Sequence, residues 1–157
     1  GRYIDTTKNN FINTLNISCF SFTKIAYLAS SLMKNGGSLI TLSFYGANKV
    51  MPNYNVMGVA KAALETSVKY LSVDLGNKNI RVNAISAGPM RTLAGAAISK
   101  SREVYKFTQK NSPLKRNTNL EELGNAALYF VSDLSQAVSG EIHFVDCGFN
   151  TIGMPKP

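Results

Sequence analysis

Two short apolar segments, each bounded by turn residues, constrain the fold of this 157-residue chain more than any other feature. Residues 38–43 follow Gly36 and Gly37, and residues 80–86 are closed by Gly88 and Pro89. The apolar run at residues 38–43 is typical of a strand that is buried on both faces of a sheet, and residues 80–86 are predicted to form a second strand. A third strand is predicted at residues 141–145, after Gly140.

Long helical patterns separate these segments. Apolar residues cover more than one helical stripe between residues 10 and 33, which predicts a helix buried on two sides, against a sheet and against a partner helix or subunit. A second helix is expected from about Pro52 to Gly76, and shorter ones at residues 93–98 and 102–110. A capping box of Thr118 and Glu121 predicts a last helix that ends near Asp133.

Strands joined by helical crossovers indicate an α/β fold with a parallel sheet covered on both faces. Only three strands are predicted, however, and three strands make a poor doubly wound sheet. We therefore expect residues 1–157 to be the C-terminal portion of a single Rossmann-like domain whose N-terminal strands are missing.

The composition indicates a globular chain, since 45% of the residues are hydrophobic and 17% are charged. The sequence contains no apolar run of membrane-spanning length and no signal segment, which predicts a cytoplasmic protein without a membrane partner. Cys19 and Cys147 lie far apart, and His143 is the single histidine, so neither a disulfide framework nor a metal site is expected. His143 itself is expected to be structural.

Basic residues outnumber acidic ones by 17 to 9, which favours an acidic partner. The charge alone does not choose between nucleic acid, anionic lipid and an acidic protein. No nucleic-acid-binding motif accompanies it, so no nucleic-acid partner is expected.

Tyr54 and Lys61 form the candidate reaction site. They are seven residues apart, so on a helix over residues 53–76 both would lie on one face, two turns apart. A tyrosine hydroxyl stays protonated at neutral pH and can stabilise a developing oxyanion, and a nearby ammonium lowers the cost of that charge. For an arbitrary pair with this spacing, a packed ring and a solvated lysine would be the better interpretation.

Three segments overturn that simpler interpretation, because together they carry a family resemblance: Tyr54-Asn-Val-Met-Gly-Val-Ala-Lys61, Arg81-Val-Asn-Ala-Ile-Ser-Ala-Gly-Pro-Met-Arg-Thr92 and Ser139-Gly-Glu-Ile-His-Phe-Val-Asp-Cys-Gly148. Over essentially its whole length, the chain resembles the C-terminal three-fifths or so of the NADH-dependent enoyl-acyl carrier protein reductases of bacterial type II fatty-acid synthesis. These enzymes are a divergent branch of the short-chain dehydrogenase/reductase superfamily. Six residues between Tyr and Lys are specific to this branch, since ordinary short-chain dehydrogenases have three.

The resemblance implies an activity and an assembly. The activity is reduction of the trans-2 double bond of enoyl-acyl carrier protein by NADH, in fatty-acid elongation. Tyr54 would donate a hydrogen bond to the enolate oxygen, and Lys61 would bind the nicotinamide ribose. The assembly would be a homotetramer.

The resemblance also implies the remaining site residues. The expected cofactor contacts are Leu42, Ser43, Lys61, Ala87, Gly88, Pro89, Met90, Thr92, Leu93 and Ala94. The expected substrate contacts are Phe44, Tyr54, Met57, Ala94, Ala97, Ile98 and Val104, several of them in a substrate-binding flap over residues 93–104. The chain departs from the family at Phe44, where a second active-site tyrosine is usual. Phenylalanine cannot donate a hydrogen bond, and the adjacent Tyr45 is expected to point the other way.

The sequence does not contain the Gly-rich turn and following acidic residue that bind the adenosine half of a dinucleotide. NADH rather than NADPH is therefore implied by the family alone, and the isolated chain is expected to be inactive. Three hypotheses stay open: a C-terminal fragment of an active enoyl reductase, a truncated binding or assembly module, and a 3-oxoacyl-type short-chain reductase. The spacing of Tyr54 and Lys61 counts against the third.

Six basic residues follow the predicted flap: Lys100, Arg102, Lys106, Lys110, Lys115 and Arg116. The acyl carrier protein that presents such substrates is strongly acidic. These residues are therefore expected to form either an electrostatic docking face for the carrier protein or an ordinary solvated basic face.

Overall fold

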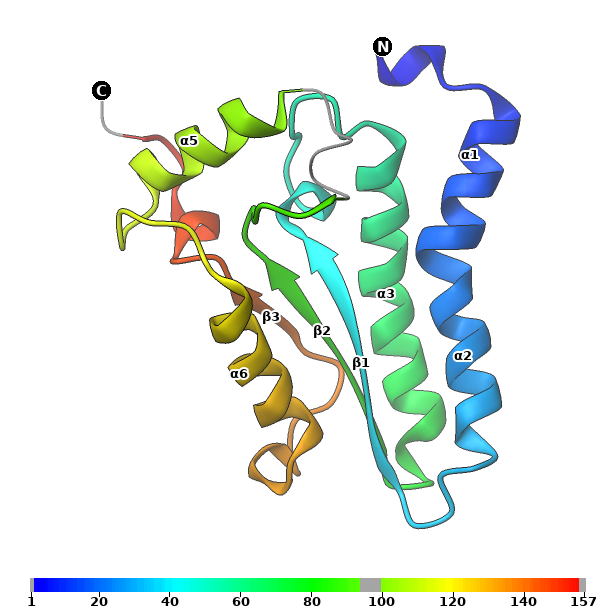
Figure 1. Cartoon of the computed structure of the whole chain (residues 1–157). Helices are drawn as coiled ribbons and strands as arrows, with labels where there is room; N and C mark the ends of the chain where they lie inside the picture. The colour runs from blue at the N-terminus through cyan, green and yellow to red at the C-terminus, as the bar shows by residue number, and fades with distance from the viewer. Residues whose placement is uncertain (1, 94–99, 156–157) are drawn as a thin grey trace.

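The sheet of the computed structural model, which describes residues 2–93 and 100–155, has three parallel strands. These strands are β1 (Gly37–Phe44), β2 (Ile80–Ala87) and β3 (Ile142–Val145), in the order β1-β2-β3. Ser43 pairs with Ser86 and Ala87 with Val145, so all three carboxyl ends meet at one edge of the sheet (Figure 1). The predicted α/β class, the three strands and their parallel direction are confirmed.

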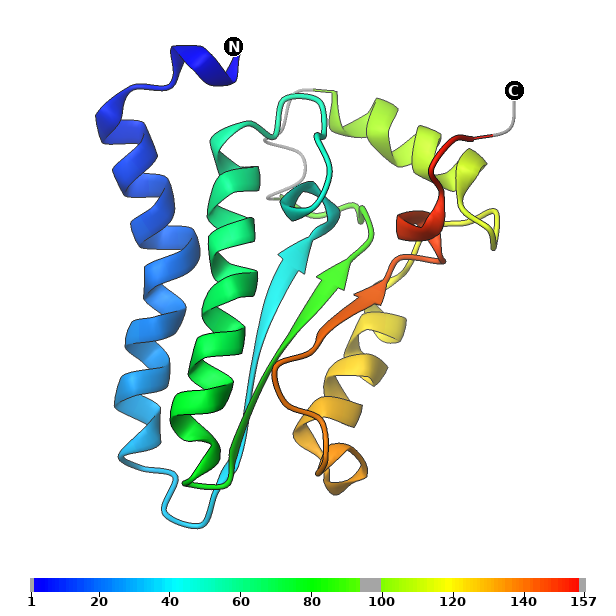
Figure 2. The ribbon, with the colours of Figure 1, turned by 180° about the vertical axis from the view of Figure 1, so that it is seen from behind.

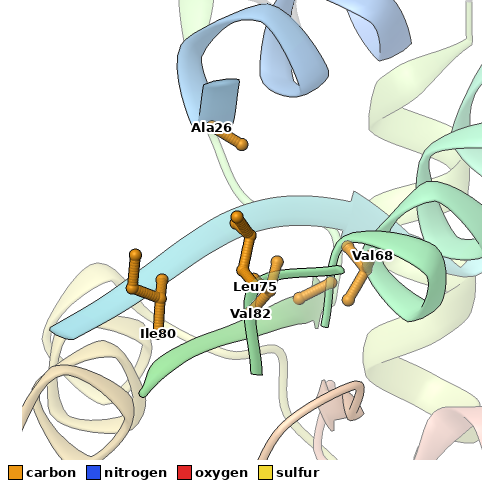
Figure 3. Packing of buried hydrophobic residues seen from close by; sticks show 6 residues of the cluster. Ala26, Val68, Leu75, Ile80 and Val82 are labelled. Carbon is orange, nitrogen blue, oxygen red and sulfur yellow. The ribbon is translucent and has the colours of Figure 1, made fainter. Parts of the chain in front are cut away.

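Helices cover both faces of this sheet. On one face α3 (Val56–Gly76) packs against the strands, and on the other α6 (Leu120–Val131) does so (Figure 2). The first core joins Val68 and Leu75 of α3 to Ile80 and Val82 of β2, with Ala26 beside them (Figure 3). The second core joins Ile85, Ala87, Leu123 and Phe130.

Burial differs strongly between the strands. Val82, Ala84 and Ile85 of β2 are fully buried, as predicted for a strand covered on both faces. Most β1 residues are only half-buried, and Leu42 is 50% exposed. The predicted burial of β1 on both faces is therefore wrong, because in the described part of the chain β1 is an edge strand that pairs with β2 alone.

The N-terminal helical rod lies beside α3 and consists of three parts. A π-helical turn (Asn16–Phe20) joins α1 (Lys8–Leu15) to α2 (Ser21–Ser30). Among these residues only Ala26 is buried, whereas Ile17 is 71% exposed. The position of this helix is as predicted, but its inner face packs mainly on α3 instead of on the sheet. The face that points away from α3 has no cover within the described residues, so its burial against a subunit stays a prediction. Within those residues, no helix combines the length and hydropathy that a bilayer span requires.

The start of α3 differs from its prediction. Asn53 and Asn55 have φ angles of 62° and 44°, in the left-handed region that a right-handed helix excludes. Residues 52–55 therefore form a turn, and the helix begins at Val56 instead of near Pro52.

The capping box of α6 is displaced by one residue from its prediction. Asn119 Oδ1 accepts a hydrogen bond from the Glu122 amide, and the Glu122 carboxylate accepts one from the Asn119 amide. Thr118 is buried, and its hydroxyl donates to the Val145 carbonyl. Its side chain is therefore committed to the end of β3 and does not cap the helix.

Asn83 fixes the approach to β3. Its buried side chain donates from Nδ2 to the Val138 carbonyl at 2.9 Å and accepts at Oδ1 from the Glu141 amide at 3.0 Å. Nearby, Arg81 donates to the carbonyls of Phe130 and Ser132 at the end of α6. These bonds hold α6 and the residues just before β3 against the central strand.

Candidate active site

The carboxyl ends of β1 and β2 bring the predicted cofactor residues to one edge of the sheet. β1 is followed by a short 3-10 turn (Tyr45–Ala47), and β2 by Gly88 and Pro89. The Gly88 amide donates to the Val145 carbonyl at 2.9 Å. A Cβ at Gly88 would lie only 3.0 Å from Cα of Asp146, so a glycine lets this loop lie directly against the end of β3.

Tyr54 lies in the turn that precedes α3. It therefore does not share a helix face with Lys61, and the predicted two-turn helical relation between them is wrong. Its ring packs edge to face on Phe44, with the ring centroids 4.9 Å apart. Burial raises the pKa of Tyr54 to about 12, so its hydroxyl is protonated at neutral pH and able to donate.

Two glycines that the sequence analysis missed create the space for this ring. A Cβ on Gly46 would overlap the Tyr54 ring, and a Cβ on Gly58 would lie 2.8 Å from the Gly46 carbonyl oxygen. The Tyr45–Ala47 turn consequently sits directly on the first turn of α3. A cavity of about 370 Å³ adjoins this contact, lined by residues 46–51 and by Tyr54, Asn55, Gly58, Val59, Ala62 and Tyr3.

Phe44 and Tyr45 contact different partners. Phe44 packs on Tyr54, whereas the Tyr45 ring packs edge to face on Phe149, with centroids 5.4 Å apart. This is the divergence expected of adjacent residues at a strand end. Phe44 thus faces the candidate proton donor with an apolar ring.

Lys61 is held at the end of β1 by its ammonium group. Nζ donates to the Leu42 carbonyl at 2.8 Å, and the side chain is half-buried. Burial lowers the pKa of Lys61, and the neighbouring Cys19 and Glu65 oppose this shift. An ammonium has three N–H donors, and Leu42 accepts from one of them, which suits Lys61 to binding a second group at this edge.

Glu65 is a buried site residue that the sequence analysis did not predict. It lies one turn after Lys61 on α3 and is 9% exposed. Its Oε1 accepts from the Ser43 hydroxyl, and its Oε2 accepts from Asn48 Nδ2 at 3.0 Å. The available signal was a carboxylate inside an apolar stretch of helix, which predicts a buried group with partners. The hydroxyl of Ser43, a predicted cofactor contact, therefore donates a hydrogen bond to Glu65.

The other predicted residues are distributed along the same edge. Ala87, Gly88, Pro89, Met90, Thr92 and Leu93 follow one another at the end of β2 and beyond it. Met90 packs on the α6 side of the sheet, and Leu93 is 95% exposed. Met57 lies in the first turn of α3, and Val104 lies half-buried in α5 (Ser101–Asn111). Ala94, Ala97 and Ile98, with the central part of the predicted flap, lie outside the described residues.

The basic residues lie at the N-cap of α5, on α5 itself and on the loop that follows it. Arg102, Lys106 and Lys110 are exposed on the helix. Lys100 pairs with Glu103 at 3.9 Å, and Arg116 pairs with Glu122 at 2.6 Å. Part of the positive charge is therefore balanced locally, and the rest faces solvent.

The cysteines and the histidine have structural surroundings. Cys19 and Cys147 are free thiols; Cys19 contacts the Ser67 hydroxyl, and the buried Cys147 contacts that of Thr118. The His143 ring packs on Phe130, with centroids 5.4 Å apart. Among the residues that the structure describes, no group of three or more His, Cys, Asp or Glu side chains could hold a metal ion.

Comparison with known proteins identifies the family. A family model described as enoyl-(acyl carrier protein) reductase matches residues 1–150. Enoyl-(acyl-carrier-protein) reductase (NADH) 1 of Rhizobium meliloti is 59% identical over 154 residues, which are 98% of this chain and 57% of that protein. The corresponding FabI reductase of Rickettsia typhi is 58% identical over 156 residues, 99% of this chain and 60% of that protein.

Solved structures agree with these relatives. The reductase of Anaplasma phagocytophilum, in complex with NAD, matches with a TM-score of 0.96 and 58% identity, over 100% of this chain and 60% of that one. The Bacillus cereus reductase, with NADP+ and indole naphthyridinone, matches with a TM-score of 0.96 and 45% identity, over 98% of this chain and 60% of that one. The chain thus spans about three-fifths of the length of these relatives. It belongs to the enoyl-(acyl carrier protein) reductase family and has part of that family's Rossmann-like fold.

Proposed function

We propose that this chain is the C-terminal portion of a single Rossmann-like reductase domain that reduces the trans-2 double bond of enoyl-acyl carrier protein with NADH. The observation that carries this proposal is the position of the Tyr54 side chain, which packs on Phe44 at the carboxyl edge of a parallel sheet. The relatives from Rhizobium meliloti and Rickettsia typhi, which are named as NADH-dependent enoyl-acyl carrier protein reductases, support the cofactor and the reaction.

Tyr54 would act where charge develops on the substrate. When bound, NADH supplies the hydride that reduces the β-carbon of the enoyl thioester. Negative charge then accumulates on the thioester oxygen, and a preorganised hydroxyl lowers the free energy of that transition state by donating a hydrogen bond. Because burial keeps Tyr54 protonated well above neutral pH, the hydroxyl acts as a donor over the whole physiological range.

The residues at this edge fit a nicotinamide cofactor. Lys61 presents an ammonium beside the end of β1, where it could donate to ribose hydroxyls. Gly88 keeps the loop after β2 free of a side chain, so that Ala87, Pro89 and Met90 could offer backbone groups to a carboxamide. We assign Leu42, Ser43, Thr92, Leu93 and Ala94 to the same cofactor site, on the family resemblance.

An apolar wall would receive the acyl chain. We assign Phe44, Met57 and Val104 to this wall, together with Ala94, Ala97 and Ile98, on the family resemblance. At residue 44 the wall offers an aromatic ring without a hydroxyl, so Tyr54 is the donor that we assign to the carbonyl.

The exposed basic residues of α5 support a docking face for the acidic carrier protein. Arg102 and Lys106 lie on the helix that follows residue 100, close in sequence to the predicted flap. Opposite charges on the two partners would accelerate their association and make it sensitive to salt.

A homotetramer is the proposed assembly. The apolar side chains on the outer face of the N-terminal rod support it, since Ile17 is 71% exposed and Ile25 is 58% exposed. Light scattering of the purified full-length protein tests this, and a monomeric mass would contradict it.

The decisive experiment compares two substrates in the full-length protein. Oxidation of NADH is followed at 340 nm with a crotonyl thioester and with an acetoacetyl thioester. We expect oxidation with the enoyl substrate only. Oxidation with the 3-oxoacyl substrate alone would indicate a 3-oxoacyl reductase, and NADH binding without turnover of either would indicate a non-catalytic binding module.

A further inference from the structure

Glu65 joins three separate parts of the candidate active site. From α3, its carboxylate reaches Ser43, the penultimate residue of strand β1, and Asn48, just after the Tyr45–Ala47 turn. Both groups donate to it, one to each oxygen, at a side chain that is 9% exposed. A buried carboxylate is costly unless its oxygens accept hydrogen bonds, and here each of them does.

The bond from Ser43 is one of two consecutive ties between β1 and α3. Leu42 accepts from Lys61, and the next residue, Ser43, donates to Glu65, one helical turn further along α3. The strand end is thus bound to α3 by its backbone at one residue and by its side chain at the next. The link to Asn48 extends this attachment to the loop that carries Gly46.

We propose that Glu65 is a positioning residue for the reduction, which holds the end of β1 and the Tyr45–Ala47 turn on α3 and so fixes Phe44 and Gly46 against the Tyr54 ring. This inference rests on the proposed function. Phe44 and Gly46 both lie between the two residues that Glu65 binds, and both touch Tyr54. Loss of the carboxylate therefore frees Phe44 and Gly46, which orient the Tyr54 ring, without removing any group that contacts the substrate.

The groups that face Glu65 define the effect of a substitution. They are Ser43 from β1, Asn48 from the loop, and the charged Lys61 from the preceding turn of α3. Glutamine has nearly the shape of glutamate, but it offers one acceptor oxygen and one NH₂ donor. Its oxygen can accept from Asn48 while its NH₂ group donates to the Ser43 hydroxyl, so E65Q replaces two hydrogen bonds to a charged carboxylate by neutral ones that are about half as strong.

The test uses E65Q in the full-length protein, with E121Q as a matched control because Glu121 is exposed on α6. Turnover of crotonyl thioester, NADH affinity and backbone hydrogen exchange of residues 44–58 are measured for each. We expect E65Q to lower kcat on the order of tenfold, because weaker bonds to Ser43 and Asn48 let the Tyr54 hydroxyl move away from its productive position. NADH affinity should change much less, and exchange should accelerate in residues 44–58 but not in α6. E121Q should resemble the wild type.

Further variants make the result decisive. S43A should lower kcat in the same direction, and the combined loss in S43A/E65Q should be smaller than the product of the two single losses, because the two side chains share one hydrogen bond. If E65Q does not accumulate as a folded protein, N48A tests the same attachment from the loop, where Asn48 is exposed.

The proposal is overturned if kcat stays within twofold of wild type, or if exchange accelerates equally throughout the chain, which would indicate a merely structural role. Failure of the proposed function looks different. If the wild-type protein reduces no enoyl thioester, the proposed function is contradicted. The exchange pattern of residues 44–58 would still decide whether Glu65 holds Phe44 and Gly46 in place.

Discussion

The ammonium group of Lys61 donates a hydrogen bond to the backbone carbonyl of Leu42 at 2.8 Å. Leu42 directly precedes the residues Ser43 and Phe44 that end β1, so this bond places a cation where the strand stops. The same contact keeps Lys61 half-buried, and burial lowers its pKa.

Replacement of Lys61 by alanine should weaken NADH binding by roughly ten- to a hundredfold, the range for loss of a charge-assisted hydrogen bond. Turnover at saturating NADH should change less, because Lys61 is assigned to the ribose and not to the thioester oxygen. Fluorescence titration with NADH measures the affinity. An unchanged dissociation constant in K61A would contradict the assignment.

The pH dependence of NADH binding gives a second test of Lys61. Since its pKa is lowered, Lys61 loses its charge at a lower pH than an exposed lysine does. The affinity of the wild type for NADH should therefore decline as the pH rises through that lowered pKa, while the affinity of K61A stays flat. The control is K69A, which removes an exposed lysine from the same helix.

Replacement of Tyr54 by phenylalanine should lower kcat by about 10²- to 10³-fold, the usual effect of removing one donor to a developing oxyanion. NADH affinity should stay near the wild-type value. Steady-state kinetics and NADH titration separate the two effects. Equal losses in turnover and in cofactor affinity would contradict the proposed roles, in which Tyr54 stabilises the enolate oxygen and Lys61 binds the cofactor.

Tyr54 should also leave a signature in alkaline stability. Its pKa is raised from 10.0 to about 12 by burial, so between these values the unfolded chain releases this proton before the folded one. The unfolded state then binds fewer protons, and the free energy of unfolding falls as the pH rises from 10.0 to about 12. Urea unfolding at several pH values should show a steeper decline for wild type than for Y54F.

Gly46→Ala should displace the Tyr54 ring, because the new Cβ would overlap it. We expect kcat to fall at least tenfold, since catalysis depends on the hydroxyl position to within about 1 Å. G124A is the matched control, because a Cβ there meets nothing within 4 Å, and an exposed helical Gly→Ala is stabilising by roughly 0.5–1 kcal/mol. Wild-type turnover in G46A would show that the ring tolerates the change.

Charge reversal at Arg102 and Lys106 should raise KM for carrier-bound substrate several-fold at low salt and leave KM for a crotonyl thioester without the carrier unchanged. The matched control is K34E/K78E, which reverses two exposed lysines at the amino ends of β1 and β2. An unchanged KM for the carrier-bound substrate in R102E/K106E would show that α5 is an ordinary solvated basic face and not a docking face.

The strands and their direction could be predicted because uninterrupted apolar runs and helical crossovers are local signals. The start of α3 could not be predicted. Asparagine adopts a positive φ at only a small energetic cost, and the packing of the Tyr45–Ala47 turn determines where it does so. Both Thr118-x-x-Glu121 and Asn119-x-x-Glu122 satisfy the capping rule. Burial of Thr118 against β3 decides between them.

Tyr54 and Lys61 were found because a sequence motif contains both of them. Glu65 was missed because its partners Ser43 and Asn48 lie 22 and 17 residues away, on elements whose approach to α3 no local pattern reveals. Gly46 and Gly58 were missed for the same reason, since a close approach exists only once the two segments have met.

The hydrogen bonds of Asn83 have a kinetic consequence. They join residues that are 55 and 58 positions apart, so the chain must close a long loop before this amide can be satisfied and β3 can pair with β2. Loop closure of this kind precedes any stabilisation from the contacts that it allows. We therefore expect the joining of β3 to the sheet to be a slow step in the folding of these residues, and substitutions at Asn83 to lower the folding rate as well as the stability.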